Sequence, residues 1–238
     1  MGRFLVSSSG GKDSLLALAR TLEAGREVVG LLTTVSEPFG RVTMHGVRRE
    51  LMAAQAEALG LPLFEVRLPQ PQPENPEDRC PLCPLDAPQA GLVPNTTYEK
   101  VMLAALEPLV QSGVEGVVFG DIHLADLRRF REALLARVGL SAEFPLWGND
   151  PETLAAEFAA QGGRAIVVCC REDLGFLLGS RTDNGFLGKL PAGVDPCGEN
   201  GEFHTFVFAH KLFSKQVPFV LGERINRDGF VWQDLVLA

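Results

Sequence analysis

Short apolar runs alternate with amphipathic stretches over the first 140 residues. The apolar run that begins at Phe4 has the length of a buried strand, and the leucines and alanines from Lys12 to about Ala24 recur at helical spacing. The same alternation predicts further strands at 27–34, 63–68 and 116–121 and further helices at 47–59, 97–111 and 124–138. Strands that alternate with helices in this way predict an α/β fold with a parallel, doubly wound, Rossmann-like sheet.

The pattern changes after residue 143. We interpret 143–148 as a linker, followed by a helix at 151–161, a strand at 164–170, a strand that starts near Glu202 and an apolar C-terminal strand at 230–237. We therefore expect a nucleotide-binding domain at 1–143 and a smaller α+β substrate domain at 144–238. We also expect the last strand to be exposed, so that it could pair with a second subunit in a homodimer.

A proline-rich segment from Pro69 to Asn95 interrupts the first half. Its prolines exclude a regular helix or a central strand, and a loop of this length suggests a lid over a site. It contains the pair Cys80 and Cys83, which would need two more ligands to hold zinc. Ordinary loop cysteines, a metal site and a redox pair all stay open.

Composition narrows the class of protein. The net charge of −8 argues against a broad nucleic-acid-binding surface. No apolar window is long enough for a membrane span, and no signal-peptide pattern opens the chain, so we expect a cytoplasmic protein. The five cysteines are expected to be free thiols. Four arginines fall on the predicted helix at 124–138, as a solvated or a ligand-facing cluster: Arg128, Arg129, Arg131 and Arg137.

The first strand ends in a loop suited to phosphate. Gly10 and Gly11 allow a tight turn and a close approach to the backbone, and the next residues open a helix whose first amides are free. Phosphate binds readily at such a helix N-terminus. The spacing of the glycines fits neither the Walker pattern nor the dinucleotide-binding fingerprint.

Other candidate residues fall where the remaining strands end. Thr33 and Thr34 should border the same ligand as the loop, because ligands lie beyond the carboxyl ends of parallel strands. Gly120 and Asp121 follow the next strand, and Asp121 could hold Mg²⁺ or a ribose, or cap a helix. His123 is a weaker candidate for meeting a phosphate.

A second polar cluster precedes the strand near residue 203. Strand alternation puts Glu202 and His204 on the same face, so their side chains should project together. The cluster fits either a substrate site or a polar turn leading into a hairpin. Its candidate substrate-binding residues are Glu199, Asn200, Gly201, Glu202, His204 and Thr205.

The motifs together resemble one family. The run Ser9–Ser14 reads Ser-Gly-Gly-Lys-Asp-Ser and resembles the pyrophosphate loop of the N-type ATP pyrophosphatases. Further motifs in the same order make nearly the whole chain similar to the diphthine:ammonia ligase (diphthamide synthase) family. These motifs are Met44–Val47, Gly120–Ile122, Pro145–Trp147 and Gly198–Thr205.

The resemblance implies an ATP-dependent amide ligase. ATP with Mg²⁺ would adenylate a carboxylate and release pyrophosphate, and ammonia would then displace AMP. It implies catalytic roles for Lys12, Asp13, Glu202 and His204, with Glu202 or His204 orienting ammonium or accepting its proton, and Mg²⁺ at Asp121. The implied ATP-binding residues are Ser7, Ser9, Gly10, Gly11, Lys12, Asp13, Ser14, Thr33, Thr34, His45, Gly120 and Asp121.

The C-terminal motif departs from the typical ligases. Asn200 and His204 stand where those enzymes have glycine and glutamate, which resembles a sister branch suggested to amidate other carboxylates. The acceptor therefore stays open among diphthine, a corrinoid acid and another small or protein-borne carboxylate. Two alternatives remain: a tRNA-modifying sulfur-transfer enzyme that uses Cys80 and Cys83, and an ATP-binding sensor without turnover.

Overall fold

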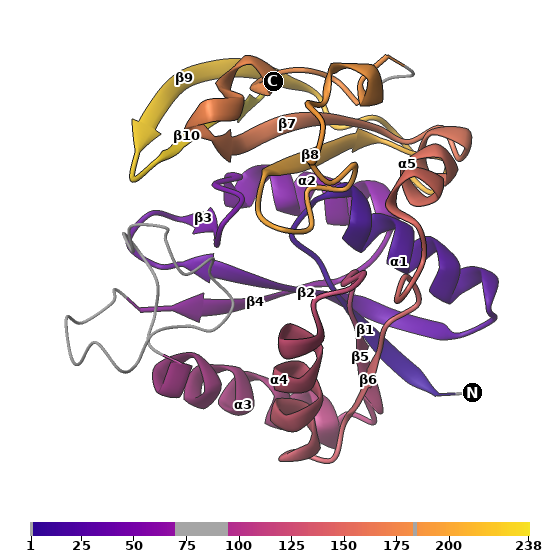
Figure 1. Ribbon diagram of the computed structural model, residues 1–238. Coiled ribbons are helices and arrows are strands. Elements are labelled where there is room, and N and C mark those ends of the chain that lie inside the picture. Colours follow the sequence, from indigo (N-terminus) through magenta and orange to yellow (C-terminus); the bar gives the residue numbers. More distant parts are fainter. Residues whose placement is uncertain (1, 70–94, 183–184) are drawn as a thin grey trace.

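The computed structural model describes residues 2–69, 95–182 and 185–238. Within them, two sheets lie one above the other with a layer of helices between them (Figure 1). The helices α1 and α2 form that layer, and α3 and α4 cover the other face of the first sheet (Figure 1). The site described below lies where the first sheet, α1 and the second sheet meet.

The first sheet is built from the N-terminal 143 residues. Its strands are β1 (Arg3–Ser7), β2 (Glu27–Ser36), β3 (Arg41–Val42), β4 (Leu63–Leu68), β5 (Gly116–Val118) and β6 (Ser141–Glu143). β2, β1, β5 and β6 lie side by side in parallel, and β4 also pairs in parallel with β2. Only the short β3 runs antiparallel, along the end of β2. This arrangement confirms the predicted parallel α/β fold.

Helices on both faces bury the apolar strands. They are α1 (Lys12–Glu23), α2 (Arg49–Leu59), α3 (Asn95–Gln111) and α4 (Ala125–Ala136). Leu16 of α1 packs in one core cluster with Val6 of β1, and this cluster includes Val207 from the C-terminal half. Leu106 of α3 and Leu135 of α4 belong to the cluster on the opposite face. Alternate residues of each buried strand thus supply two cores.

The second sheet is antiparallel, in the order β8-β7-β10-β9. Its strands are β7 (Arg164–Arg171), β8 (Phe203–Ala209), β9 (Phe219–Arg227) and β10 (Phe230–Leu237), accompanied by α5 (Pro151–Ala160), η1 (Glu172–Leu177) and η2 (Leu187–Lys189). Ile166 and Phe206 from this sheet pack with Leu51 and Met52 of α2. The second sheet therefore closes over the helix layer of the first.

One expectation about the second half was wrong. The C-terminal strand is not an exposed edge, because β10 lies between β7 and β9 and the edge strand is β9. The expected linker at 143–148 follows β6, whose last residue is Glu143, and from residue 144 it holds no helix or strand before α5. The domain boundary at residues 143 and 144 stays a prediction.

The expected lid, with Cys80 and Cys83, lies outside the described residues. No helix in the described ranges is both long and apolar enough to cross a membrane.

Candidate active site

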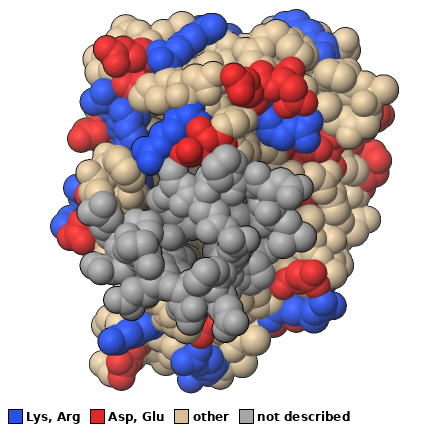
Figure 2. All heavy atoms as spheres, turned by 60° about the vertical axis from the view of Figure 1, so that its left-hand side comes forward, with Lys and Arg blue, Asp and Glu red and all other residues tan. Residues whose placement is uncertain are grey.

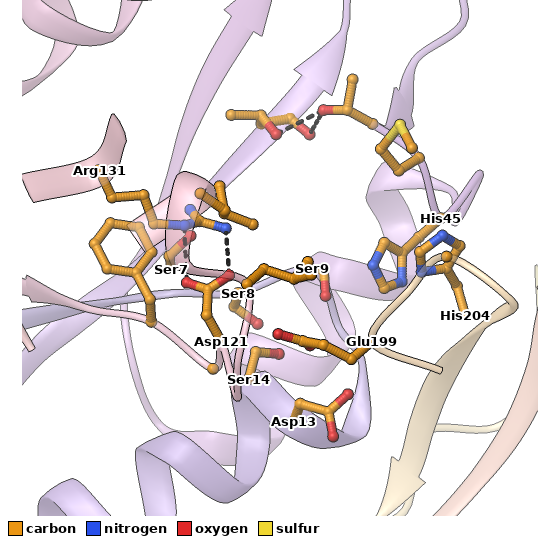
Figure 3. A pocket seen from close by; sticks show the side chains of 18 of the residues that line it. Ser7, Ser8, Ser9, Asp13, Ser14, His45, Asp121, Arg131, Glu199 and His204 are labelled. Carbon is orange, nitrogen blue, oxygen red and sulfur yellow. Dashed lines mark hydrogen bonds and ion pairs between the residues drawn. The ribbon is translucent and has the colours of Figure 1, made fainter. Parts of the chain in front are cut away.

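A pocket of about 760 Å³ opens beyond the carboxyl ends of β1, β2 and β5. The loop before β8 forms its opposite wall, so both halves of the chain contribute to it (Figure 3). The predicted site residues on its wall are Ser7, Ser9, Asp13, Ser14, Thr34, His45, Gly120, Asp121, Glu199, Asn200, Gly201, His204 and Thr205. The structure therefore brings most of the predicted site residues together around one pocket.

The loop between β1 and α1 has the tight form that its glycines predicted. Gly10 adopts a φ of +81°, and Gly11 is the N-cap of α1. A Cβ atom on Gly11 would lie 3.2 Å from His45 Cε1 and 3.3 Å from the carbonyl oxygen of Thr205. These glycines do not line the pocket themselves; they let the second half of the chain approach the loop closely.

Lys12 does not face the pocket. Its Nζ donates to both carboxylate oxygens of Asp13 at 2.8 Å and to the carbonyl oxygen of Cys197 at 2.6 Å. Burial opposes the charge of Lys12, but the neighbouring Asp13 carboxylate outweighs it and raises the lysine pKa above its ordinary value. Lys12 thus joins the loop at 9–14 to the loop before β8, whereas the sequence predicts a charge directed at phosphate.

Further hydrogen bonds fasten the start of β8 onto the same loop. Thr205 Oγ1 accepts from the amide of Lys12 at 3.2 Å, and the amide of Val207 donates to the carbonyl of Gly10 at 2.9 Å. Gln55 Nε2 donates to the carbonyls of Gly10 and Val207 at 3.1 and 2.8 Å. Gln55 is buried in α2, and its role was not visible in the sequence, because its partners lie 45 and 152 residues away.

Glu199 lies on the pocket wall between the two halves of the chain. Glu199 lines the pocket and accepts from the amide of Ile122 at 2.8 Å, which joins the C-terminal loop to the exit of β5. Burial, with Asp121 and Asp13 nearby, raises the pKa of Glu199 to about 7. Its carboxylate therefore titrates in the physiological range.

Glu202 does not project into the pocket beside His204, contrary to the sequence prediction. It is 3% exposed, and its carboxylate accepts from the amides of Asp195 at 3.1 Å and Asn200 at 3.0 Å. The strand begins only at Phe203, so the alternation does not extend back to Glu202. In the loop before the strand, backbone amides hold this carboxylate.

Two histidines from distant segments meet on the pocket wall. The ring centroids of His45 and His204 lie 4.4 Å apart (Figure 3). Burial, the other ring and Lys12 hold the pKa of His45 well below its ordinary value, and burial with Lys12 lowers that of His204 to about 4. Both rings are therefore neutral at physiological pH, and the buried Nδ1 of His45 has no hydrogen-bond partner within the described ranges.

Asp121 is engaged by an arginine. Arg131 Nε lies 2.8 Å from one carboxylate oxygen of Asp121, and Arg131 Nη2 donates to the other at 3.1 Å (Figure 3). A carboxylate held on both oxygens by a guanidinium group does not fit the expected role of Mg²⁺ ligand. In the described part of the chain, three or more His, Cys, Asp or Glu residues nowhere gather in a way that could hold a metal ion.

The arginines of α4 are of two kinds, because one faces the pocket and others lie on the solvated surface. Arg131 lines the pocket, whereas Arg128 lies 4.7 Å from the ring centroid of Trp147 and exposed Arg129 pairs with Asp126. Only part of this basic cluster thus faces the site. His123 also lines the pocket, with Nε2 3.3 Å from Asn200 Oδ1.

The predicted site residues Gly120, Thr34 and Thr33 have different surroundings in the structure. A Cβ atom on Gly120 would lie within 2.8–2.9 Å of backbone atoms of Asp13 and Ser14, so glycine allows the exit of β5 to pack on α1. Thr34 lines the pocket and accepts from the hydroxyl of Thr43 at 2.6 Å. Thr33 is buried away from the pocket wall, and its hydroxyl has no partner among residues that the structure describes.

Several wall residues were missed. Ser8 belongs to the same loop, and Thr43 to the turn before His45. An apolar part of the wall includes Tyr98 of α3 and Phe230 of β10. The position of Thr43 beside a recognised motif was a usable signal, whereas nothing local marked Tyr98 or Phe230.

Comparisons with known proteins agree with the motifs. The model of the diphthamide synthase N-terminal domain matches residues 2–78, and that of the C-terminal domain matches residues 150–232. The diphthine–ammonia ligase of Rattus norvegicus is 27% identical over 234 residues, which cover 91% of this chain and 82% of the rat protein. That of Schizosaccharomyces pombe is 26% identical over 228 residues, which cover 88% of this chain but 34% of that longer protein.

A solved structure is also similar. It is described as a predicted subunit of tRNA methyltransferase from Methanocaldococcus jannaschii, with 17% sequence identity and a TM-score of 0.37. The match covers 68% of this chain and 75% of the other.

The two domain models match in chain order and together account for more than half of the sequence, and the relatives align over most of it. The chain therefore belongs to the diphthine:ammonia ligase (diphthamide synthase) family.

Proposed function

We propose that the protein is an ATP-dependent amide ligase. It adenylates a substrate carboxylate, with ATP converted to AMP and pyrophosphate, and transfers ammonia to the activated carboxyl group. The observation that carries this proposal is the pocket formed jointly by the loop at 9–14 and the loop at 198–205, since the reaction needs a nucleotide site and an acceptor site in contact. The family membership supports it.

The loop at 9–14 suits the first step. Adenylation joins a carboxylate oxygen to the α-phosphorus of ATP and breaks its bond to the pyrophosphate oxygen. Ser7, Ser9 and Ser14 line the pocket at the N-terminus of α1, where hydroxyl donors and the helix dipole favour the developing charge on pyrophosphate. Arg131 lies on the same wall, where its guanidinium group pairs with Asp121.

The neutral imidazoles suit the second step. Ammonia attacks the acyl carbon, the nitrogen loses a proton, and the bond to the AMP phosphate oxygen breaks. His204 lies on the pocket wall, whereas the carboxylate of Glu202 is held by loop amides away from it, and this difference in position supports His204 over Glu202 as the proton acceptor. His45 lies beside His204 and would orient its ring.

A second candidate is a sensor that binds ATP without turnover. The observation in its favour is the engagement of Lys12 by Asp13 and Cys197, which leaves no lysine directed at phosphate in the described loop. The sulfur-transfer alternative depends on Cys80 and Cys83, outside the described residues.

Product analysis tests the proposal. The full chain is incubated with ATP, Mg²⁺, ammonium and a panel of carboxylates, and the products are followed by phosphorus NMR. AMP and pyrophosphate that appear only with a particular carboxylate support the ligase. ADP and phosphate contradict it, and tight ATP binding without turnover on any acceptor favours the sensor. Replacing Ser14 by alanine should abolish turnover, whereas the control Ser112→Ala, in the exposed turn after α3, should not.

A further inference from the structure

Two exposed and two half-buried apolar side chains gather at one side of the pocket. Phe39, in the turn between β2 and β3, is 55% exposed, and Met44 is 43% exposed. Phe230 and Trp232 of β10 stand side by side, with ring centroids 5.9 Å apart. We call these four side chains the rim. Met44 and Phe230 also line the pocket, so the rim continues into the site.

Contacts between the two halves of the chain hold the rim together. The guanidinium group of Arg227 lies 6.0 Å from the ring centroid of Phe39, and Arg227 is the cross-strand partner of Phe230. A Cβ atom on Gly46 would lie 2.8 Å from Cδ1 of Trp232, so the turn after Met44 packs tightly against β10. The rim is therefore one surface rather than scattered exposed residues.

Met44 is strained where it joins the rim. Its φ of +68° is in the left-handed region, which costs a bulky side chain on the order of 1 kcal/mol or more. Hydrogen bonds from the amide of His45 to the carbonyl of Thr43 at 2.8 Å, and from the amide of Gly46 to that of Val42 at 3.0 Å, impose this turn. The strain turns an apolar side chain outward at a pocket mouth, where burial would require a bound molecule.

The surroundings of the rim favour an acid. Arg41 and Arg48 share the single carboxylate of Asp234, so this cluster carries one net positive charge in a chain whose net charge is −8. Figure 2 shows basic and acidic side chains interspersed over the described surface of one face, so an excess of positive charge is local rather than spread over the face. Arg41 also donates to the carbonyl of Gly46 at 2.8 Å, so this positive charge lies beside the turn that carries Met44 and favours an anionic ligand.

We propose that the rim binds the apolar body of the acceptor, which is a small carboxylic acid with a bulky apolar or aromatic group rather than a short aliphatic acid. The inference rests on the proposed ligase function, because the carboxylate must reach the loop at 9–14. A folded protein partner would bury about 800 Å² on each side. The rim instead continues into a pocket of about 760 Å³, a size typical of small-molecule sites, which favours a small molecule.

Calorimetric binding of three acids tests the proposal. Acetate, cyclohexylacetate and 2-naphthylacetate are titrated into the full chain in the presence of AMP. Wild type should bind more tightly along this series, with about tenfold or more between the first and last, because more apolar area is buried. No increase along the series overturns the proposal, as does the absence of binding by all three acids.

Variants show whether the rim causes the increase. The double variant Phe39→Ser/Met44→Asn should lose most of it, and asparagine tolerates the left-handed conformation, so the fold should be kept. The control Phe176→Ser removes a side chain that is 62% exposed in η1 and absent from the pocket wall, and it should leave the increase unchanged. An equal increase in the double variant overturns the proposal. ATP cleavage is measured in parallel, so failure of the ligase function and failure of the rim are read separately.

Discussion

Replacing Asp234 by asparagine removes the carboxylate that joins β10 to the segment carrying His45. Arg41 Nη1 and Arg48 Nη2 each lie 2.7 Å from an oxygen of this carboxylate, which is 7% exposed. Burial opposes the ionisation of Asp234, but Arg48 and Arg41 outweigh it and lower the pKa from 3.8 to about 2. At about 1.4 kcal/mol per unit of pKa, the ionised carboxylate contributes about 2 kcal/mol to folding.

The sign of the pH dependence follows from the lowered pKa. The stabilisation is fully present above pH 4 and is lost as the pH falls toward 2, because the unfolded chain takes up the proton first. We expect Asp234→Asn to lower the free energy of unfolding by about 2 kcal/mol at neutral pH, and the melting temperature by about 4–8 °C for a chain of this size. The difference from wild type should shrink below pH 4.

Urea unfolding at several pH values measures this effect. The control Asp173→Asn breaks an ion pair with Arg171 whose carboxylate side is 64% exposed, and we expect it to cost less than about 1 kcal/mol. The reasoning is refuted if Asp234→Asn costs no more than this control. It is also refuted if the cost stays the same from pH 7 to pH 3.

Three further substitutions probe the site. Gly120→Ala forces a Cβ atom against the backbone of α1. We expect a loss of about 1–3 kcal/mol in stability, measured by thermal unfolding, and weaker ATP binding, measured by titration. Unchanged stability would contradict the packing argument. Glu199→Gln removes a carboxyl group whose pKa is higher in the folded protein than in the unfolded chain. Wild type should therefore lose stability relative to this variant as the pH rises from 5 to 8. A stability difference between the two proteins that stays constant across that range would argue against burial of the group. Lys12→Met leaves Asp13 without its partner and frees the C-terminal loop. A ligase should then lose turnover by about a hundredfold or more, whereas a sensor should only bind ATP less tightly. Single-turnover kinetics and ATP titration distinguish these two outcomes.

Local spacing was sufficient to predict much of this protein. The turn at Gly10 and the helix from Lys12 depend on adjacent residues, and the structure has them where the pattern indicated. Strand alternation also located β4 at Leu63–Leu68 as expected. Features of this kind are visible in sequence because the residues that cause them are neighbours in the chain.

The remaining features depend on contacts between distant segments. Asp121 resembled a metal ligand until Arg131, on the next helix, accounted for its carboxylate. Lys12 resembled a phosphate ligand, but its partner Cys197 lies 185 residues away. The strand pattern predicts Glu202 in the pocket, but β8 begins one residue later, at Phe203, and loop amides hold the carboxylate. Patterns in the sequence identified these side chains as unusual but could not say what each one contacts.

Transfer of oxygen-18 tests the central claim most directly. A carboxylate that supports turnover is labelled with oxygen-18 in its carboxyl group and incubated with the protein, ATP, Mg²⁺ and ammonium. If the carboxylate attacks the α-phosphorus, one labelled oxygen is transferred to AMP when ammonia displaces it, and mass spectrometry should detect labelled AMP. Unlabelled AMP, or label found in inorganic phosphate, would contradict an acyl-adenylate intermediate and with it the proposed ligase.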